Sequence, residues 1–134
     1  MAVVLDSDAV VGFLDRDDAL HDAADKAIRD LLAKERLLVS VVTYAEVLTG
    51  AKLGHHDERQ VKGFFSDLIS EVLPVDMDVA DMAASLRSRR KSLRMPDAMI
   101  LATAELQPGV GLVLTGDREA VKVRDLTCKL QLLR

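Results

Sequence analysis

Short apolar runs and longer amphipathic stretches alternate along the whole chain. The run Val3–Leu5 contains no polar residue, which is typical of a short buried strand. From His21 to Glu35, apolar residues such as Ala24, Ile28 and Leu31 instead recur on one helical face. Read in this way, the pattern predicts strands at about 3–5, 37–42, 72–75, 111–115 and 127–133. It predicts helices at about 12–15, 21–35, 43–53, 58–69, 78–91 and 96–106.

This order of elements predicts an α/β fold. Parallel strands need long crossover connections, usually helices, so we expect a mostly parallel sheet of about five short strands with helices on both faces, in three layers. The sequence shows no internal repeat, low-complexity tract or linker, and 134 residues can bury a single core. We therefore expect one domain that spans residues 1–134.

The composition narrows the class of protein. The formal net charge of −4 argues against nonspecific nucleic-acid binding through a generally basic surface. With no Trp, one Tyr and three Phe, the chain also lacks a platform on which bases would stack. No apolar run approaches the roughly 20 residues of a membrane helix, the N-terminus does not resemble a signal peptide, and the single Cys has no partner for an internal disulfide. We expect a cytoplasmic protein in which any contact with nucleic acid is confined to a small patch.

Four acidic residues are predicted to meet at one edge of the sheet. Asp6 and Asp117 each follow a predicted strand, and the C-terminal ends of parallel strands share an edge, where ligands of α/β proteins bind. Glu46 is expected in the first turn of the helix that leaves the second strand. Asp97 lies at the start of a helix that runs down to Leu106 and leads into the next strand, so the N-terminal end of that helix returns to the same edge.

Each acid also has an ordinary structural explanation. Asp6 and Asp117 could cap helices, Glu46 could close a capping box with Thr43, and Asp97 could complement a helix dipole. Four separate caps have no reason to gather, however, and two carboxylates 4 Å apart repel by about 4 kcal/mol at an effective dielectric constant of 20. A cation would relieve that repulsion. Oxygen ligands without His or Cys favour Mg²⁺ or Mn²⁺, and two such ions suit hydrolysis of a phosphodiester bond.

Four segments resemble the PIN-domain ribonucleases, and among them the VapC toxins of bacterial toxin–antitoxin modules. The segments are VVLDSDAVVGFL, VSVVTYAEVLTGA, MPDAMILATA and LVLTGD, which occur in this order over nearly the whole chain. The resemblance implies a PIN-like fold and an endoribonuclease that depends on Mg²⁺, with Mn²⁺ as a substitute. It implies RNA, a VapB-type antitoxin and a second toxin chain as partners, in a homodimer or in a heterotetramer or larger complex with antitoxin. The acids that would bind the metal and catalyse cleavage are Asp6, Glu46, Asp97 and Asp117.

Further residues surround these four acids in the sequence. The resemblance implies that the hydroxyls of Ser7 and Thr115 order the pocket. Asp8 stands where many relatives carry a small polar residue, so a fifth carboxylate could enter the metal site. The segment from position 87 to 94 holds five cations in eight residues and is either a solvated helix end or a patch that positions RNA phosphates. The arginines of that patch would be Arg87, Arg89, Arg90 and Arg94.

Two other functions fit parts of the sequence. The segment LDSDAV also resembles the opening motif of haloacid-dehalogenase-type phosphohydrolases, in which Asp6 would be the nucleophile and Asp8 the general acid. That family needs a later Lys and a closing acidic motif, which GDRE matches only in part, and it leaves Glu46 and Asp97 without a role. The second alternative is a non-catalytic module whose acidic pocket binds an Arg of a partner protein.

Overall fold

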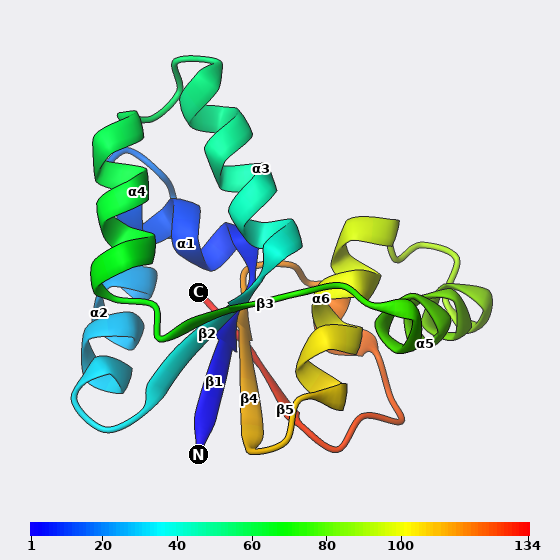
Figure 1. The fold of residues 1–134 in the computed structure, drawn as a ribbon. Coiled ribbons are helices and arrows are strands. Elements are labelled where there is room, and N and C mark those ends of the chain that lie inside the picture. The colour runs from blue at the N-terminus through cyan, green and yellow to red at the C-terminus, as the bar shows by residue number, and fades with distance from the viewer.

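A five-stranded sheet forms the middle of the molecule in the computed structural model, which describes residues 1–134 (Figure 1). The order across the sheet is β3-β2-β1-β4-β5, and every neighbouring pair is parallel. The predicted α/β fold with a parallel sheet of five strands is confirmed. The strands are β1 (Ala2–Leu5), β2 (Arg36–Ser40), β3 (Glu71–Leu73), β4 (Val110–Thr115) and β5 (Lys129–Leu132).

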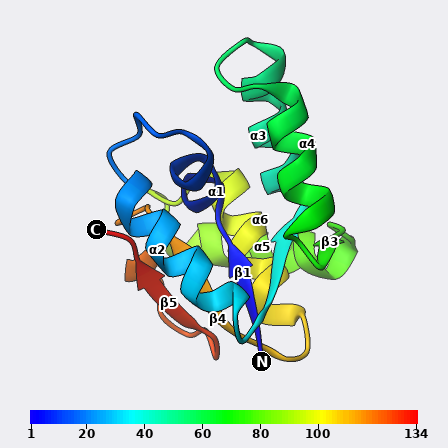
Figure 2. The ribbon, with the colours of Figure 1, turned by 90° about the vertical axis from the view of Figure 1, so that its left-hand side faces the viewer.

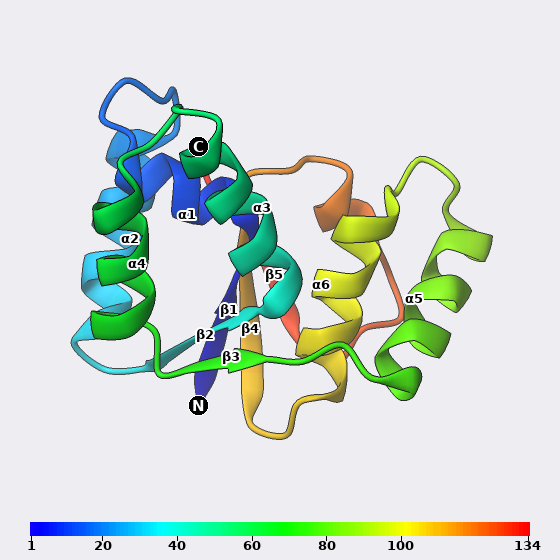
Figure 3. The ribbon, with the colours of Figure 1, turned by 45° about the horizontal axis from the view of Figure 1, so that its top comes forward.

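Helices cover both faces of this sheet. The helices are α1 (Ser7–Leu14), α2 (His21–Leu32), α3 (Val41–Lys52), α4 (Glu58–Asp67), α5 (Met77–Arg89) and α6 (Met95–Leu106), with a short 3₁₀ turn η1 (Ala120–Lys122). Buried residues of α1 to α4 pack on one face, and buried residues of α5 and α6 pack on the other, which gives three layers (Figure 3). No helix is both long and apolar enough to cross a membrane.

Each central strand contributes to both cores. On β1, Val3 and Leu5 pack against α1 to α4, whereas Val4 packs against α5 and α6. On β4, Leu114 and Val113 divide between the same two cores. Successive side chains of a strand point to opposite faces, so a strand that is covered on both faces is apolar throughout. This is why the run at the N-terminus has no polar residue.

The carboxyl ends of the strands form one edge of the sheet, which lies away from the N-terminus in Figure 1. α1 and α3 begin at this edge, and α3 packs against α4 in a hairpin that projects beyond it (Figures 1 and 2). The strand order reverses between the neighbours β1 and β4, because β1 is followed by β2 on one side and β4 by β5 on the other. Ligands in open α/β sheets bind at such a reversal.

The predicted start of the first helix is wrong. α1 begins at Ser7, immediately after β1, and not near residue 12. Asp6 is its N-cap, and the carboxylate Oδ1 of Asp6 accepts the backbone N–H of Ser7 at 2.6 Å. The capping explanation for Asp6 is therefore correct for Oδ1, while the second carboxylate oxygen has another partner.

The predicted boundary between the second strand and its helix is also wrong. β2 ends at Ser40, whose hydroxyl accepts the N–H of Val42 at 3.0 Å and so caps α3. The capping box between Thr43 and Glu46 is not formed, and Glu46 lies in the second turn of α3, not in the first. The other predicted elements are present, with ends that differ by a few residues.

Candidate active site

Asp6 is buried where β1 passes into α1. Its Oδ2 accepts a hydrogen bond from the hydroxyl of Thr115 at 2.5 Å. Its backbone N–H donates to the carbonyl of Leu114 at 2.9 Å, which ties the end of β1 to β4. The side chain is thus held from two directions, by the N–H of Ser7 in α1 and by Thr115 at the end of β4.

The pKa of Asp6 is raised from 3.8 to about 7. The largest cause is burial, since the residue is only 4% exposed. The charges of Asp8 and Asp97 raise the pKa further, while the hydrogen bond from Thr115 lowers it. At neutral pH this carboxyl is partly protonated, so a cation that binds it has to displace a proton.

The hydroxyl of Thr115 also joins Asp6 to Asp117. Thr115 is fully buried, and its Oγ1 accepts the backbone N–H of Asp117 at 3.0 Å while it donates to Asp6. Oδ1 of Asp117 in turn accepts the N–H of Glu119 at 2.9 Å. The half-buried carboxylate of Asp117 is therefore fixed by the turn that follows β4.

Asp8 packs against the same turn from the first turn of α1. A Cβ at Gly116 would lie 3.1 Å from the Cβ of Asp8 and would meet the end of the Leu20 side chain, so a larger residue there would force both neighbours to shift. The pKa of Asp8 is raised by burial of its carboxyl and then by the charges of Asp117 and Asp97. The fifth carboxylate is thus electrostatically part of the cluster.

Glu46 reaches the cluster from α3. The hydroxyl of Ser7 donates to Oε1 of Glu46 at 2.6 Å and lies 3.4 Å from the hydroxyl of the buried Thr43. Ser7 thereby links the start of α1 to α3 across the carboxyl edge. Glu46 faces the other acids because this hydroxyl holds it there.

Asp97 is buried in the first turn of α6 and is paired with Arg94. Nε of Arg94 donates to Oδ2 of Asp97 at 3.1 Å, and the two side chains are 72% and 8% exposed, respectively. Burial raises the pKa of Asp97, the hydrogen bond and charge of Arg94 oppose that shift, and the charges of Asp117 and Glu46 add to it. The carboxylate of Asp97 is thus buried, whereas the guanidinium that pairs with it is exposed to water.

Five carboxylates therefore share this edge of the sheet with one guanidinium. The acids that the structure brings together are Asp6, Asp8, Glu46, Asp97 and Asp117. Their oxygen-only chemistry fits a hard divalent ion such as Mg²⁺ or Mn²⁺. No three of them enclose a metal position with the side chains as they stand. No buried side-chain polar atom lacks a hydrogen-bond partner.

The other arginines of the basic segment are bound to the protein itself. Arg87 and Arg90 each donate to a backbone carbonyl, at 2.7 and 3.1 Å. Arg89 lies 3.8 Å from Asp125 in an exposed ion pair. Arg94 alone contacts an acid of the cluster. In this segment, Arg87, Arg89 and Arg90 therefore contact groups outside the acid cluster, and only Arg94 contacts the cluster.

The sequence pattern did not predict two features of the site. The pairing of Arg94 with Asp97 has a signal that could have revealed it, because the residue that caps a helix lies next to the third residue of that helix. The cap at Ser40 is hidden because the two valines that follow it favour a strand. Both features place side chains of the acid cluster.

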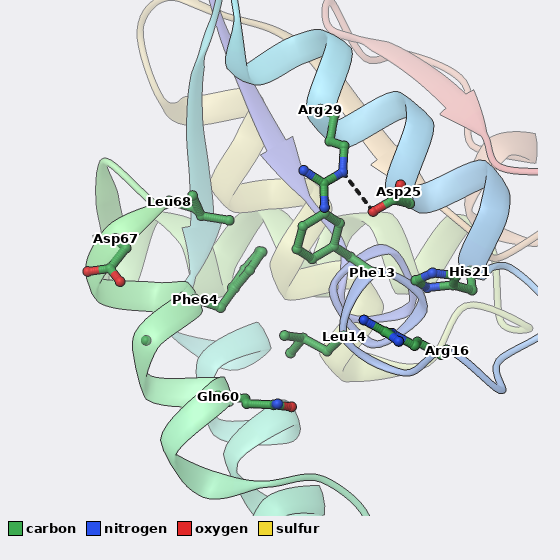
Figure 4. A pocket seen from close by; sticks show the side chains of 11 residues that line it. Phe13, Leu14, Arg16, His21, Asp25, Arg29, Gln60, Phe64, Asp67 and Leu68 are labelled. Atoms are coloured by element: carbon green, nitrogen blue, oxygen red, sulfur yellow. Dashed lines mark hydrogen bonds and ion pairs between the residues drawn. The ribbon is translucent and has the colours of Figure 1, made fainter.

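A second concave surface, also missed from the sequence, lies between α1, α2 and α4 (Figure 4). This groove has a volume of about 620 Å³, and none of the five acids lines it. The rings of Phe13 and Phe64 lie 5.4 Å apart on its floor, and the guanidinium of Arg29 lies 5.7 Å above Phe13. The other residues that line it are Leu14, Arg16, His21, Asp25, Gln60, Gly63, Asp67 and Leu68.

The family model of the PIN domain matches residues 3–126. This chain therefore belongs to the PIN domain family. It does not belong to the haloacid-dehalogenase-type phosphohydrolases, the alternative that the segment LDSDAV suggested. No curated protein matches the chain by sequence. The predicted PIN-like three-layer fold is confirmed by the solved structures to which the chain is similar.

Several of these similar structures are toxin–antitoxin complexes. VapBC2 from Rickettsia felis, bound to a DNA fragment from their promoter, has a TM-score of 0.76 at 13% identity, with 100% of both chains covered. A toxin–antitoxin complex from Klebsiella pneumoniae has a TM-score of 0.69 at 26% identity, with 87% of both covered. VapC20 of Mycobacterium tuberculosis, a sarcin–ricin loop cleaving toxin, has a TM-score of 0.72 at 16% identity, with 96% of this chain and 99% of that chain covered.

Proposed function

We propose that this protein is a divalent-metal-dependent endoribonuclease and the toxin of a type II toxin–antitoxin module. The observation that carries the proposal is the gathering of five carboxylates around a single guanidinium at the carboxyl edge of a PIN fold. Such a cluster is unfavourable for stability without a cation. Among the similar structures, VapC20 is a toxin that cleaves the sarcin–ricin loop, and this supports RNA as the substrate class.

The metal would be held by the four acids of the motif segments. Mg²⁺ is the proposed ion, Mn²⁺ can replace it, and the charge of Asp8 is close enough to modulate the site. When bound, the ion supplies a Lewis acid that activates water and neutralises charge on the scissile phosphate. The proposed ligands are Asp6, Glu46, Asp97 and Asp117.

Hydroxyl groups would keep these ligands in place. Thr115 fixes Asp6 relative to Asp117, and Ser7 fixes Glu46, through hydrogen bonds of 2.5 to 3.0 Å. Groups that orient ligands in this way commonly decide the affinity of a metal site. Because Asp6 has a pKa of about 7, we expect ion binding to release a proton and to weaken below neutral pH.

The basic segment is the proposed contact for RNA phosphates. Arg94 stands at the acids, and Arg87, Arg89 and Arg90 lie on the same segment just before α6. Cations of this kind position a nucleic acid without reading its sequence. The chain is acidic overall, so a local group of cations is where phosphate contacts are most favourable.

The proposed partner is a VapB-type antitoxin, bound in the groove between α1, α2 and α4. Several similar structures are complexes of a toxin with its antitoxin. The groove offers an aromatic floor from Phe13 and Phe64 and a charged rim, which suits the apolar face of an amphipathic helix. We expect the toxin to form a homodimer and, with antitoxin, a heterotetramer or a larger complex.

A cleavage assay with purified protein tests the proposed function. The chain is incubated with a structured RNA in Mg²⁺ or Mn²⁺, with EDTA and the Asp97→Asn variant as controls. We expect discrete RNA fragments with the wild-type protein and metal, and intact RNA in both controls. Intact RNA in every sample, together with retained binding of the antitoxin, would instead indicate the non-catalytic partner-binding module.

A further inference from the structure

Arg94 is the only cation that forms an ion pair with any acid of the cluster. Its guanidinium forms one hydrogen bond: Nε donates to Asp97, and the two terminal nitrogens have no protein partner. The hydrogen bond to Asp97 and the charge of Asp97 raise the pKa of Arg94, and the charges of Glu46 and Asp117 add to that shift. One guanidinium thus partly neutralises several carboxylates.

The pair of Arg94 and Asp97 is buried at one end only. The carboxylate is 8% exposed, whereas the arginine side chain is 72% exposed and extends from the residue that precedes α6. An exposed arginine loses little when it leaves such a pair, because water replaces the carboxylate around it. A buried carboxylate loses much more, because it is left without a counter-charge. Asp97 therefore needs a cation, and Arg94 is free to move.

The same carboxylate is one of the proposed metal ligands. Oδ2 of Asp97, which accepts from Arg94, is occupied as long as the guanidinium stays in place. A divalent ion brings two positive charges to the cluster and repels the guanidinium next to it. The guanidinium and the divalent ion therefore compete for Oδ2 of Asp97, and the binding of one weakens the binding of the other.

We propose that Arg94 is a built-in counter-ion that competes with the divalent ion for Asp97. It stabilises the acid cluster while no metal is bound, and it withdraws from Asp97 when the ion binds. This inference rests on the proposed function, since it requires that the cluster binds a divalent ion. Its consequence is that Arg94 lowers the apparent affinity for the ion and so sets the concentration at which the protein becomes loaded.

Measurement of Mn²⁺ affinity without RNA tests this competition. Calorimetry on the full chain compares wild type with Arg94→Met, which keeps the length of the side chain, and with Arg94→Lys, which keeps the charge. We expect Arg94→Met to bind Mn²⁺ about tenfold more tightly, because a repelling charge next to the ion is removed. Arg94→Lys should remain close to wild type. Arg36→Met is the matched control, because Arg36 is also an exposed arginine in an ion pair, with Glu71, and lies at the start of β2.

Thermal unfolding separates competition from a simple structural role. Without metal, Arg94→Met should melt at a lower temperature than wild type, because the cluster loses its counter-ion. With saturating Mn²⁺ the difference should disappear or reverse, since a ligand stabilises the state that it binds. A purely structural arginine would leave the same deficit with and without the ion.

Unchanged or weaker Mn²⁺ binding by Arg94→Met would overturn the proposal and would make Arg94 a positioning residue for Asp97. If wild type cleaves RNA in Mn²⁺ in that case, the proposed function stands and only the competition is wrong. If no form of the protein binds Mn²⁺ or cleaves RNA, both proposals are wrong. The two assays together therefore distinguish one failure from the other.

Discussion

The acid cluster and the groove between α1, α2 and α4 are unfavourable for the isolated chain in different ways. In the cluster every buried polar atom has a hydrogen-bond partner, yet the carboxylates repel one another and burial raises the pKa of Asp6 to about 7. The groove instead carries charges of both signs, with Arg29 paired to Asp25, and its aromatic side chains line a cavity that opens to water. The first surface is suited to a cation and the second to an apolar partner. No acid of the cluster lines the groove, so the two surfaces can be altered separately.

Replacement of Asp6 by Asn should have the largest effect on the acid cluster. Asn keeps the shape of the side chain, but its single amide oxygen can accept from Thr115 or from the N–H of Ser7 and not from both, and it offers no charge to a metal ion. We expect cleavage of RNA in Mg²⁺ to fall by roughly a hundredfold or more. Initial rates of RNA cleavage measure this loss. Cleavage within a fewfold of wild type would remove Asp6 from the metal site.

The same variant should make the metal-free protein more stable at neutral pH. The folded-state pKa of Asp6, about 7, lies above its ordinary value of 3.8. Between these values the native state keeps a proton that the unfolded state has released, so the unfolding free energy falls as pH rises from about 4 to about 7 and stays low above that. Asp6→Asn should remove a fall on the order of a few kcal/mol. Urea unfolding in EDTA at pH 5 and pH 8 measures it, and equal pH dependence in the two proteins would show that Asp6 is not the group responsible.

A large side chain at Gly63 should fill part of the groove between α1, α2 and α4 and leave the acid cluster unchanged. Gly63 lies on α4 and lines the groove, and a Cβ there would meet only Asp67, at 4.0 Å. We expect Gly63→Leu to weaken antitoxin binding by roughly 30-fold, as loss of an interface hot spot does. Gly63→Ala is the matched control, because it stabilises the helix by about 0.5–1 kcal/mol and fills little of the groove. Calorimetric titration with antitoxin measures both, and equal affinities would place the partner elsewhere.

Thr115→Val tests whether the hydroxyl between two acids is needed for their placement. Val has nearly the same shape but removes the donor to Asp6 and the acceptor for the N–H of Asp117. We expect a loss of about 1–3 kcal/mol in unfolding free energy, because a buried polar group loses its partner. RNA cleavage should fall by roughly tenfold, as for other groups that orient metal ligands. Full activity in this variant would show that the acids are placed without the hydroxyl.

The smallest effect is expected from the exposed part of the basic segment. Replacing Arg89 and Arg90 by Ala should weaken RNA binding severalfold, more at low salt than at high salt, while Mn²⁺ affinity stays the same. The stability change should be within about 1 kcal/mol, since these arginines form only exposed contacts. Fluorescence anisotropy with labelled RNA and metal measures the affinity. Unaltered RNA affinity would show that Arg89 and Arg90 do not contact RNA phosphates.

The parallel sheet and its carboxyl edge could be predicted because they depend on short-range patterns. A strand covered on both faces is apolar throughout, as in Val3–Leu5, and the direction of the strands then decides where Asp6, Asp117 and Asp97 lie. The start of α3 could not be predicted, because Val41 and Val42 favour a strand and the cap at Ser40 outweighs that preference. For this reason the sequence pattern places Glu46 in the wrong turn of the right helix.

The groove and the shifted pKa of Asp6 could not be predicted from the sequence. Phe13 and Phe64 are about 50 residues apart in the chain, and their contact depends on how α1 packs against α4. The pKa of Asp6 depends on burial and on neighbours from α1, α6 and β4, none of which follows from its local motif. Tertiary packing decides both features.

Sequencing of RNA ends after induction of the protein in cells tests the proposed nuclease most directly. The Asp97→Asn variant, induced to the same level, is the control, because it retains the shape of the side chain and loses its charge. We predict new RNA ends at defined positions with the wild-type protein that are absent with the variant. Identical end profiles in the two samples would contradict the claim that this acid cluster cleaves RNA.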